Sequence, residues 1–173
     1  MEIKIREAQE RDLQQILDIY NDAILNTTSV YNYKPHTLAM RHEWFRQKQQ
    51  DGFPVWVADL DGQAIGFGTY GPFRPWAAYK YTAEISAYID PAHRGRGIAK
   101  LLYPQLLASA QQQQLHALVA GIDATNEASL KLHRHFGFEE VGRFREVGYK
   151  FGQWLDLVFM QLLLPKPEHP TED

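Results

Sequence analysis

The segment from Tyr88 to Leu102 constrains the fold more than any other part of the sequence. It reads Tyr-Ile-Asp-Pro-Ala-His-Arg-Gly-Arg-Gly-Ile-Ala-Lys-Leu-Leu, in which an apolar strand leads into a basic turn that opens an amphipathic helix. Gly95 and Gly97 stand where the backbone must bend sharply and approach a ligand closely. Unpaired N–H groups in the first helical turn suit phosphate groups. The segment therefore predicts a strand–turn–helix unit that binds a phosphorylated ligand.

The alternative is a plain surface turn in which Arg94 and Arg96 are merely solvated. The turn does not match Gly-x-Gly-x-x-Gly, because position 100 is Lys, and it lacks the Gly-Lys-Ser/Thr ending of a P-loop. What remains is Arg94-x-x-Gly97-x-Ala99 at a strand-to-helix junction. This arrangement resembles the pyrophosphate-binding signature of the GNAT superfamily of acetyl-CoA-dependent N-acetyltransferases.

Length and composition indicate one soluble globular domain. The chain has 173 residues, 45% of them apolar, and a net charge of −3, which argues against a general nucleic-acid binder. It has no cysteine, so disulfides, thiolate metal sites and a cysteine nucleophile are excluded. No apolar run is long enough to cross a membrane, and we expect a cytoplasmic protein. We expect the domain to span residues 1–164 and the proline-rich tail, residues 165–173, to be disordered.

Hydrophobic periodicity and turn signals predict a mixed α/β order. A strand around Ile3 and Ile5 precedes a helix that starts near Asp12, and a second helix is expected between Thr37 and Gly52. Further strands are expected at residues 54–60, 63–70, 81–89, 115–122, 139–145 and 154–163. An amphipathic helix is expected after Gly97 and a short helix at 126–136. Pro104 inside the helix after Gly97 predicts a bend or an irregular turn.

This order resembles the GNAT fold over residues 2–164, which implies an α/β fold with a mixed central sheet of about seven strands flanked by about four helices. A second segment, from Asn126 to Phe138, resembles the superfamily's Asn-x-x-Ser/Ala-x-x-x-Tyr-x-x-x-Gly-Phe signature. A capped amphipathic helix that ends at Gly137 also accounts for the glycine. The resemblance implies that Asn126 and Ser129 bind the cofactor or order the preceding strand.

Position 133 departs from this signature, because His133 stands where many GNAT enzymes have the tyrosine that protonates the leaving thiolate. A subgroup resembling phosphinothricin and methionine sulfoximine N-acetyltransferases places histidine there. Tyr81-Thr82-Ala83-Glu84 and Lys150-Phe151-Gly152-Gln153-Trp154-Leu155-Asp156 are similar to the same subgroup. His133 is therefore a candidate thiolate acid, and packing or orientation on a short helix is the alternative.

Glu84 is the candidate general base. Glutamate is disfavoured in the middle of a strand, and the simple explanation is an outward face or an ion pair with Lys80. The functional explanation is that a carboxylate in a partly apolar cleft has a raised pKa and can take a proton from an ammonium substrate. The subgroup resemblance places its catalytic glutamate at this position.

The resemblance also implies that the strand end at Ala87, Tyr88 and Ile89 pairs with pantetheine amides, and that a backbone N–H there polarises the thioester carbonyl. With no cysteine to form an acyl-enzyme, direct transfer is the simpler mechanism. The expected acetyl-CoA-binding residues are Ala87, Tyr88, Ile89, Arg94, Gly95, Arg96, Gly97, Ile98, Ala99, Asn126 and Ser129.

Substrate recognition is expected in two aromatic loops. The expected substrate-binding residues are Phe73, Arg74, Trp76, Tyr79 and Tyr31. Arg74 suits a bidentate grip on a carboxylate or phosphinate, and Lys80, Lys150 or a backbone amide could bind the acid instead. We expect no metal, since His133-x-His135 lacks a third obvious ligand.

The resulting hypothesis is an acetyl-CoA-dependent N-acetyltransferase that acts on the α-amino group of a small amino acid or analogue. The resemblance suggests phosphinothricin, methionine sulfoximine or methionine sulfone as substrates, and it implies a homodimer. The alternatives are a GNAT enzyme for another small amine and a catalytically silent acyl-CoA-binding regulatory module.

Overall fold

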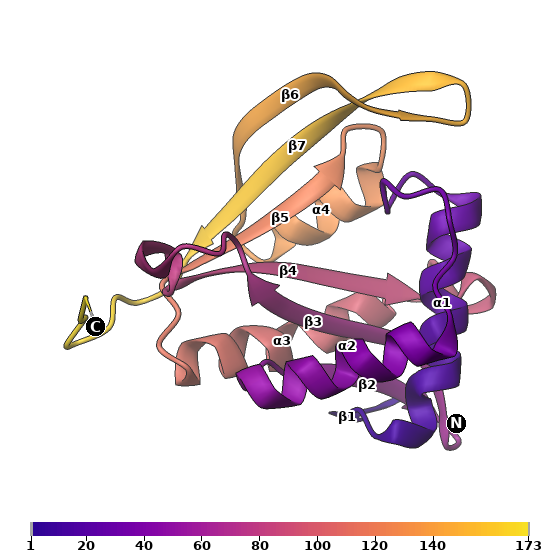
Figure 1. Cartoon of the computed structure of the whole chain (residues 1–173), viewed down its shortest axis with the longest axis horizontal. Helices are drawn as coiled ribbons and strands as arrows, with labels where there is room; N and C mark the ends of the chain where they lie inside the picture. The colour runs from indigo at the N-terminus through magenta and orange to yellow at the C-terminus, as the bar shows by residue number, and fades with distance from the viewer. Residues whose placement is uncertain (1, 173) are drawn as a thin grey trace. The chain divides into compact units, whose positions relative to one another are not determined.

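The computed structural model describes residues 2–172, so Met1 and Asp173, the ends of the expected domain and tail, lie outside the described residues. Seven strands form one sheet in the order β1-β2-β3-β4-β5-β7-β6 (Figure 1). The strands are β1 Lys4–Glu7, β2 Val55–Leu60, β3 Gln63–Pro72, β4 Thr82–Ile89, β5 Ala117–Asp123, β6 Glu139–Lys150 and β7 Gln153–Leu163. The helices are α1 Leu13–Asn26, α2 Leu38–Asp51, α3 Ile98–Gln112 and α4 Glu127–His135. The expected mixed sheet and helices are thereby confirmed.

The chain divides into two compact units. Unit one comprises Met1–Thr69 and Ser86–Leu106, and unit two comprises Tyr70–Ile85 and Leu107–Asp173. The boundaries fall inside β3, β4 and α3, so each of these elements contributes residues to both units.

In unit one, β1 and β3 flank β2 in antiparallel pairing. Asp61 and Gly62 have φ values of 52° and 90° in the β2–β3 turn, as the Asp-Gly signal predicts. Thr37 caps α2 by accepting a hydrogen bond from Met40 N at 3.2 Å, and Gly52 ends the helix in the left-handed region. Local chemistry thus predicted both the hairpin and the second helix. The core is lined by apolar side chains of α1, α2, β2 and β3: Leu13, Ile16, Ile19, Phe45, Val55, Val57, Ala64 and Phe67.

Ion pairs of Arg6 hold β1 in place within unit one. Arg6 donates to both carboxylate oxygens of Asp12, at 2.7 and 2.8 Å, and its Nε donates to Asp59 at 2.7 Å. Asp12 is only 1% exposed. Burial by itself would raise the pKa of Asp12, but hydrogen bonds from Arg6 and from Gln9 N outweigh it, so the pKa lies below its usual value. Asp12, which was expected at the start of α1, therefore forms an ion pair with Arg6 of β1.

In unit two, β4 pairs with β5 in parallel, and β7 pairs with β5 and β6 in antiparallel fashion. The β6–β7 hairpin is longer than expected, because β6 continues to Lys150 and turns at Phe151 and Gly152, whose φ values are 53° and 75°. This extension has no signal in the sequence, since residues 139–149 of β6 lack a buried face and show no apolar alternation.

Two expectations concern irregular segments. The structure assigns α3 as one continuous α-helix through Pro104, although a bend or irregular turn was expected there. The described part of the tail has no regular secondary structure, but Thr171 N donates to Tyr81 Oη at 2.9 Å and Lys80 Nζ donates to Thr171 Oγ1 at 3.0 Å.

Candidate active site

The turn between β4 and α3, which was expected to bind phosphate, lies in unit one and is built by backbone geometry. After β4, Asp90 Oδ1 accepts a hydrogen bond from Ala92 N at 2.8 Å and starts a short 3-10 turn. Gly95 and Gly97 follow with φ values of 77° and 76°, and α3 begins at Ile98. No atom lies within 4 Å of the position that a Cβ would take at either glycine. The turn therefore needs glycine for its conformation, and it leaves open space in front of the helix N-terminus.

The two arginines of the turn differ in their surroundings. Arg94 Nε donates to Ile89 O at 3.1 Å, and Arg94 Nη2 pairs with Asp22 of α1 at 2.5 Å. Arg96 is exposed and makes no hydrogen bond or ion pair with another described residue. Arg94 thus braces the turn against α1, while Arg96 can offer its charge to a phosphate.

The end of β4 packs tightly in unit one. The Tyr88 ring lies 5.3 Å from that of Tyr20 and 5.4 Å from that of Phe67 between centroids. A Cβ at Gly66 of β3 would lie 2.7 Å from Ile89 Cδ1 and 3.3 Å from Tyr88 O. A side chain at position 66 would displace the end of the Ile89 side chain and press on the Tyr88 carbonyl, so Gly66 lets β3 lie close to this strand end, whose backbone is the expected pantetheine-binding segment.

Glu84 lies in unit two, opposite Val119 in the parallel β4–β5 ladder. Its side chain reaches solvent, yet the carboxyl group lies over the sheet: a Cβ placed on Gly121 of β5 would be 3.5 Å from Glu84 Oε1 and 3.5 Å from Phe159 Cε1. This partial burial raises the pKa of Glu84, and the positive charge of Arg74 partly opposes the rise. Among the residues that the structure describes, Glu84 makes no ion pair.

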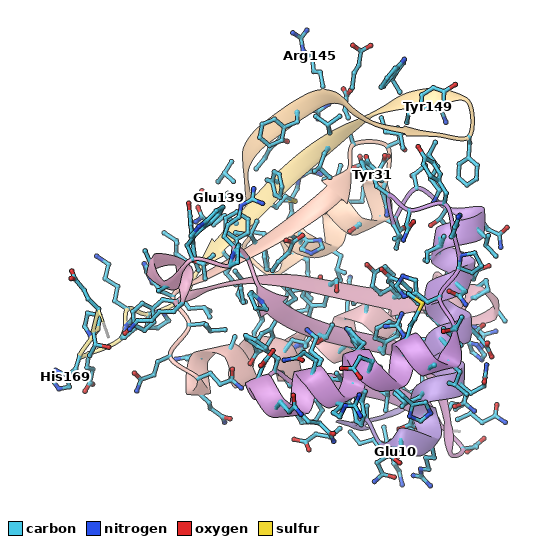
Figure 2. All side chains as sticks on the ribbon, in the orientation of Figure 1. Glu10, Tyr31, Glu139, Arg145, Tyr149 and His169 are labelled. Carbon is cyan, nitrogen blue, oxygen red and sulfur yellow. The ribbon has the colours of Figure 1, made fainter. Side chains whose placement is uncertain are left out.

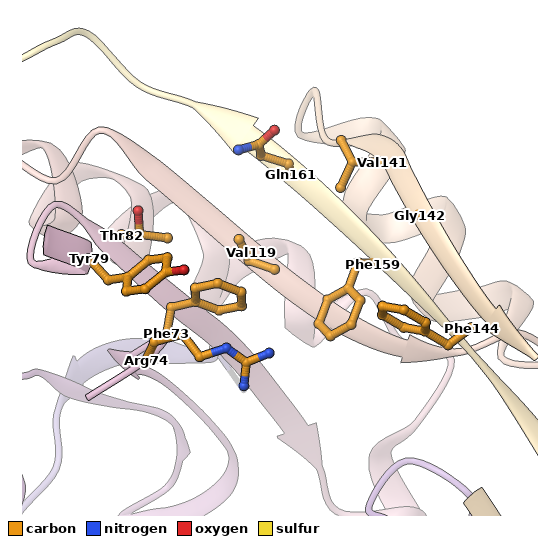
Figure 3. Close-up of a pocket in the computed structure, with 10 residues that line it drawn as sticks. All are labelled: Phe73, Arg74, Tyr79, Thr82, Val119, Val141, Gly142, Phe144, Phe159 and Gln161. Atoms are coloured by element: carbon orange, nitrogen blue, oxygen red, sulfur yellow. The ribbon is translucent and has the colours of Figure 1, made fainter. Parts of the chain in front are cut away.

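A cavity of about 400 Å³ opens on unit two (Figure 3). Its lining residues are Phe73, Arg74, Tyr79, Thr82, Val119, Val141, Gly142, Phe144, Phe159 and Gln161. Figure 3 shows the Arg74 guanidinium and the Phe73 and Tyr79 rings on the loop side, and Phe144 with Phe159 on the strands of the hairpin. Arg74 also lies over the Phe73 ring, 4.8 Å from its centroid.

Three of the five expected substrate-binding residues line this cavity: Phe73, Arg74 and Tyr79. Trp76 is 66% exposed and does not belong to the lining, although its ring lies 6.4 Å from that of Tyr79. Tyr31 belongs to unit one, in the loop between α1 and α2, and is 38% exposed.

Sequence reasoning missed the sheet and hairpin side of the cavity. The lining residues that were not expected are Thr82, Val119, Val141, Gly142, Phe144, Phe159 and Gln161. Thr82 could have been found, because alternate residues of a strand share one face and Glu84 was already identified. The others required the pairing of β5, β6 and β7, which the sequence does not show.

The helix of the second motif lies in unit two. Asn126 caps α4 by accepting a hydrogen bond from Ser129 N at 3.1 Å. His133 is 4% exposed, and its Nδ1 donates to Ser129 O at 2.7 Å, which leaves Nε2 unprotonated in the neutral ring. Burial lowers the pKa of His133, although the bond to Ser129 opposes the shift. The motif therefore builds a capped helix with a neutral, buried histidine.

Residues 2–172 hold no cluster of metal ligands and no membrane-spanning helix. Within that range no group of three or more His, Cys, Asp or Glu side chains is arranged to hold a metal ion. No helix of the same range combines the length and apolar character needed to span a bilayer.

Comparisons with known proteins agree with these motifs. The family described as "Acetyltransferase (GNAT) domain" matches residues 5–159. An L-methionine sulfoximine/L-methionine sulfone acetyltransferase of Pseudomonas aeruginosa is 45% identical over 95% of this chain and 96% of its own length. A phosphinothricin N-acetyltransferase of Streptomyces coelicolor is 37% identical over 92% and 95% of the two chains.

Solved structures extend the likeness to the whole fold. A putative acetyltransferase from Salmonella typhimurium, solved with acetyl-CoA, has a TM-score of 0.96 at 37% identity and covers 99% of both chains. A phosphinothricin acetyltransferase from Sinorhizobium meliloti, in complex with AcCoA, has a TM-score of 0.94 at 34% identity and covers 99% of this chain and 95% of its own. These matches confirm the fold and the subgroup that the motifs indicated. The chain therefore belongs to the GNAT family of acetyltransferases.

Proposed function

We propose that this protein transfers the acetyl group of acetyl-CoA directly to the α-amino group of a small amino acid or analogue, of the methionine sulfoximine, methionine sulfone or phosphinothricin type. The observation that carries the proposal is a carboxylate of raised pKa, Glu84, on the sheet face that also bears the Arg74 cavity. The names of the similar acetyltransferases supply the substrate class.

Glu84 acts as the general base in this proposal. The amine substrate arrives protonated and has no lone pair with which to attack. Glu84 takes that proton, directly or through water, because a raised pKa brings the carboxylate closer to the pKa of an ammonium group. The freed amine forms the new N–C bond and the C–S bond of the thioester breaks. The nitrogen then loses one proton to become the amide, and the thiolate gains one, so coenzyme A leaves as the free thiol. The absence of cysteine favours this direct transfer over an acyl-enzyme.

The residues of unit one fit the cosubstrate. The open space before Gly95 and Gly97, the unpaired N–H groups at the start of α3 and the exposed Arg96 offer the geometry and charge that a pyrophosphate needs. The backbone of Ala87, Tyr88 and Ile89 would bind the pantetheine amides, and Ile98 and Ala99 would supply the helical N–H groups. Asn126 and Ser129 keep their expected roles as proposals, with Asn126 acting through the cap of α4.

Arg74 is the proposed clamp for the α-carboxylate of the substrate. It lines the cavity and makes no ion pair with another residue in the described range 2–172. Of the alternative cations, Lys80 donates to Thr171 and Lys150 is 5% exposed, and neither lines the cavity. The geometry thus favours Arg74 over both lysines.

His133 keeps the thiolate-acid role only as a prediction. Its Nδ1 proton is used by Ser129 O, and burial favours the neutral ring, so a second proton for the thiolate is not held at Nε2. These contacts support an orienting role for His133 on α4.

The decisive experiment is a substrate screen with acetyl-CoA, scored by free thiol and by product mass. We expect N-acetylated products with methionine sulfone, methionine sulfoximine and phosphinothricin. Turnover only with amines that lack a carboxylate would support a GNAT enzyme for another small amine. Coenzyme A binding without turnover of any amine would instead support the silent acyl-CoA-binding module.

The same proposal includes a homodimer, a cytoplasmic location and resistance to phosphinothricin. We expect a homodimer, for which the exposed apolar side chains of the β6–β7 hairpin, among them Val147, Tyr149 and Trp154, offer a surface. Figure 2 labels Tyr149 on this hairpin. Analytical ultracentrifugation tests the dimer, cell fractionation tests the cytoplasmic location, and growth of an expressing strain on phosphinothricin tests resistance to that herbicide.

A further inference from the structure

A single rung of the sheet in unit two connects the proposed base with a polar side chain on β7. Glu84 of β4 pairs with Val119 of β5, and Val119 pairs with Gln161 of β7. Paired residues on adjacent strands share one face, so these three side chains project to the same side of the sheet. With strands about 4.8 Å apart, Glu84 and Gln161 stand about 10 Å apart at the backbone.

The residues that lie between Glu84 and Gln161 on this face of the sheet are small. Val119 is short, and the next residue of β5 on this face, Gly121, has no side chain at all. Gly121 is exposed in the middle of the strand, and the Glu84 carboxyl and the Phe159 ring each come within 3.5 Å of the place that its Cβ would take, so glycine leaves room for the tip of Glu84 over β5. A short substrate can therefore lie along the rung, between the tips of Glu84 and Gln161.

The far wall of the cavity is apolar except for Gln161. Val141, Phe144 and Phe159 form that wall, and the two phenylalanine rings meet edge to face at 5.7 Å between centroids. The Gln161 carboxamide makes no hydrogen bond with another side chain among residues 2–172. An amide set in an apolar wall with its donors and acceptor uncommitted gains most from a ligand that supplies a polar atom.

We propose that Gln161 determines side-chain specificity by hydrogen-bonding the polar end of the substrate's side chain. The inference rests on the proposed function, in which Glu84 takes the amine proton and Arg74 holds the carboxylate. Those two groups fix the α-carbon of the substrate, and its side chain then points across Val119 to Gln161. The preferred substrates are amino acids whose side chain is apolar along its length and ends in a hydrogen-bonding oxygen or nitrogen.

The test compares L-methionine sulfone with L-methionine, which share a carbon skeleton and differ in the oxygens on sulfur. We expect wild type to favour the sulfone in kcat/KM. Gln161→Leu, which keeps the shape and removes the amide, should lower kcat/KM for the sulfone about tenfold, the size of one hydrogen bond. It should leave methionine unchanged or improved.

Gln153→Leu is the matched control, because Gln153 lies on the same strand, is exposed and does not line the cavity. Thermal melting and coenzyme A binding confirm that each variant is folded. A sulfone-to-methionine ratio near one in wild type, or the same ratio in Gln161→Leu, overturns the role of Gln161 and leaves the proposed function intact. A wild type that acetylates neither compound overturns the proposed function itself, and the inference with it.

Discussion

At the scale of single residues, Glu84 and Arg74 set the chemistry of the proposed site. General-base catalysis requires the Glu84 carboxylate, so the rate rises as pH passes upward through its pKa. Burial raises that pKa in the free enzyme, and therefore the acid limb of the kcat/KM profile should lie above the ordinary range of a glutamate.

Glu84→Gln should retain both substrates and lower kcat at neutral pH by about 10²–10⁴, which is the usual effect of removing a general base. Part of the loss should be recovered at high pH, where more of the amine is already free. Steady-state kinetics across the pH range measures both effects. Near-normal turnover at neutral pH would show that another group or bulk solvent removes the proton.

Arg74→Ala should weaken binding of amino-acid substrates by about 1.5–3 kcal/mol, the range for hydrogen bonds to charged groups. The loss should vanish for the decarboxylated amine of methionine sulfone, and coenzyme A affinity should not change. Because the Arg74 charge lowers the pKa of Glu84, the acid limb should also move to higher pH. Arg74→Lys keeps the charge without the planar fork and should restore the pH limb better than the affinity. An unchanged preference between the two compounds would remove Arg74 as the clamp.

At the scale of elements, the turn before α3 depends on two left-handed glycines. Gly97→Val should weaken coenzyme A binding by more than about tenfold, because a β-branched side chain would enter the space left open for pyrophosphate. Gly52→Val is the matched control, since Gly52 has a φ of 74° and equally open surroundings at the end of α2. Calorimetry that finds equal coenzyme A affinity in both folded variants would refute the phosphate turn.

The helix α4 offers a test of whether His133 is catalytic or structural. The ring lies edge-on to Phe138 at 5.0 Å and donates to Ser129 O. If these contacts define its role, His133→Phe should lower the melting temperature and keep most of the specific activity. A fall in kcat greater than the rise in KM, with an unchanged melting temperature, would restore the thiolate-acid role.

At the scale of the whole molecule, the Arg6 cluster predicts how stability depends on pH. The pKa of Asp12 is depressed in the folded chain, so its contribution is present above the unfolded value, about 3.9, and is lost as the pH falls below it. Arg6→Met should lower the free energy of unfolding at neutral pH by about 3 kcal/mol, because it leaves a buried carboxylate without its partner. Denaturant melts of Arg6→Met and Arg6→Met/Asp12→Asn measure this. The double variant should recover much of the loss, and equal stability of the two would contradict the prediction.

The sequence predicts the fold of the molecule better than it predicts the cavity, because the signals for the fold are local. Local signals such as the Asp61–Gly62 turn and the Thr37 cap each act within a few residues, and the structure confirms them. The cavity brings Val119 of β5 together with Phe159 of β7, and their separation in sequence leaves no local signal of it. The roles of Glu84, Arg74 and the glycine turn stay predictions.

The rung Glu84–Val119–Gln161 separates the proposed base from the proposed specificity residue, so the two can change independently. Its three members belong to separate strands, each held by backbone pairing that does not depend on which side chain it carries. In the proposed mechanism, position 161 sets the range of accepted compounds and the proton-accepting group lies on β4, so a mutation at position 161 would change the first and leave the second in place. A new substrate range would then need one substitution and no inactive intermediate.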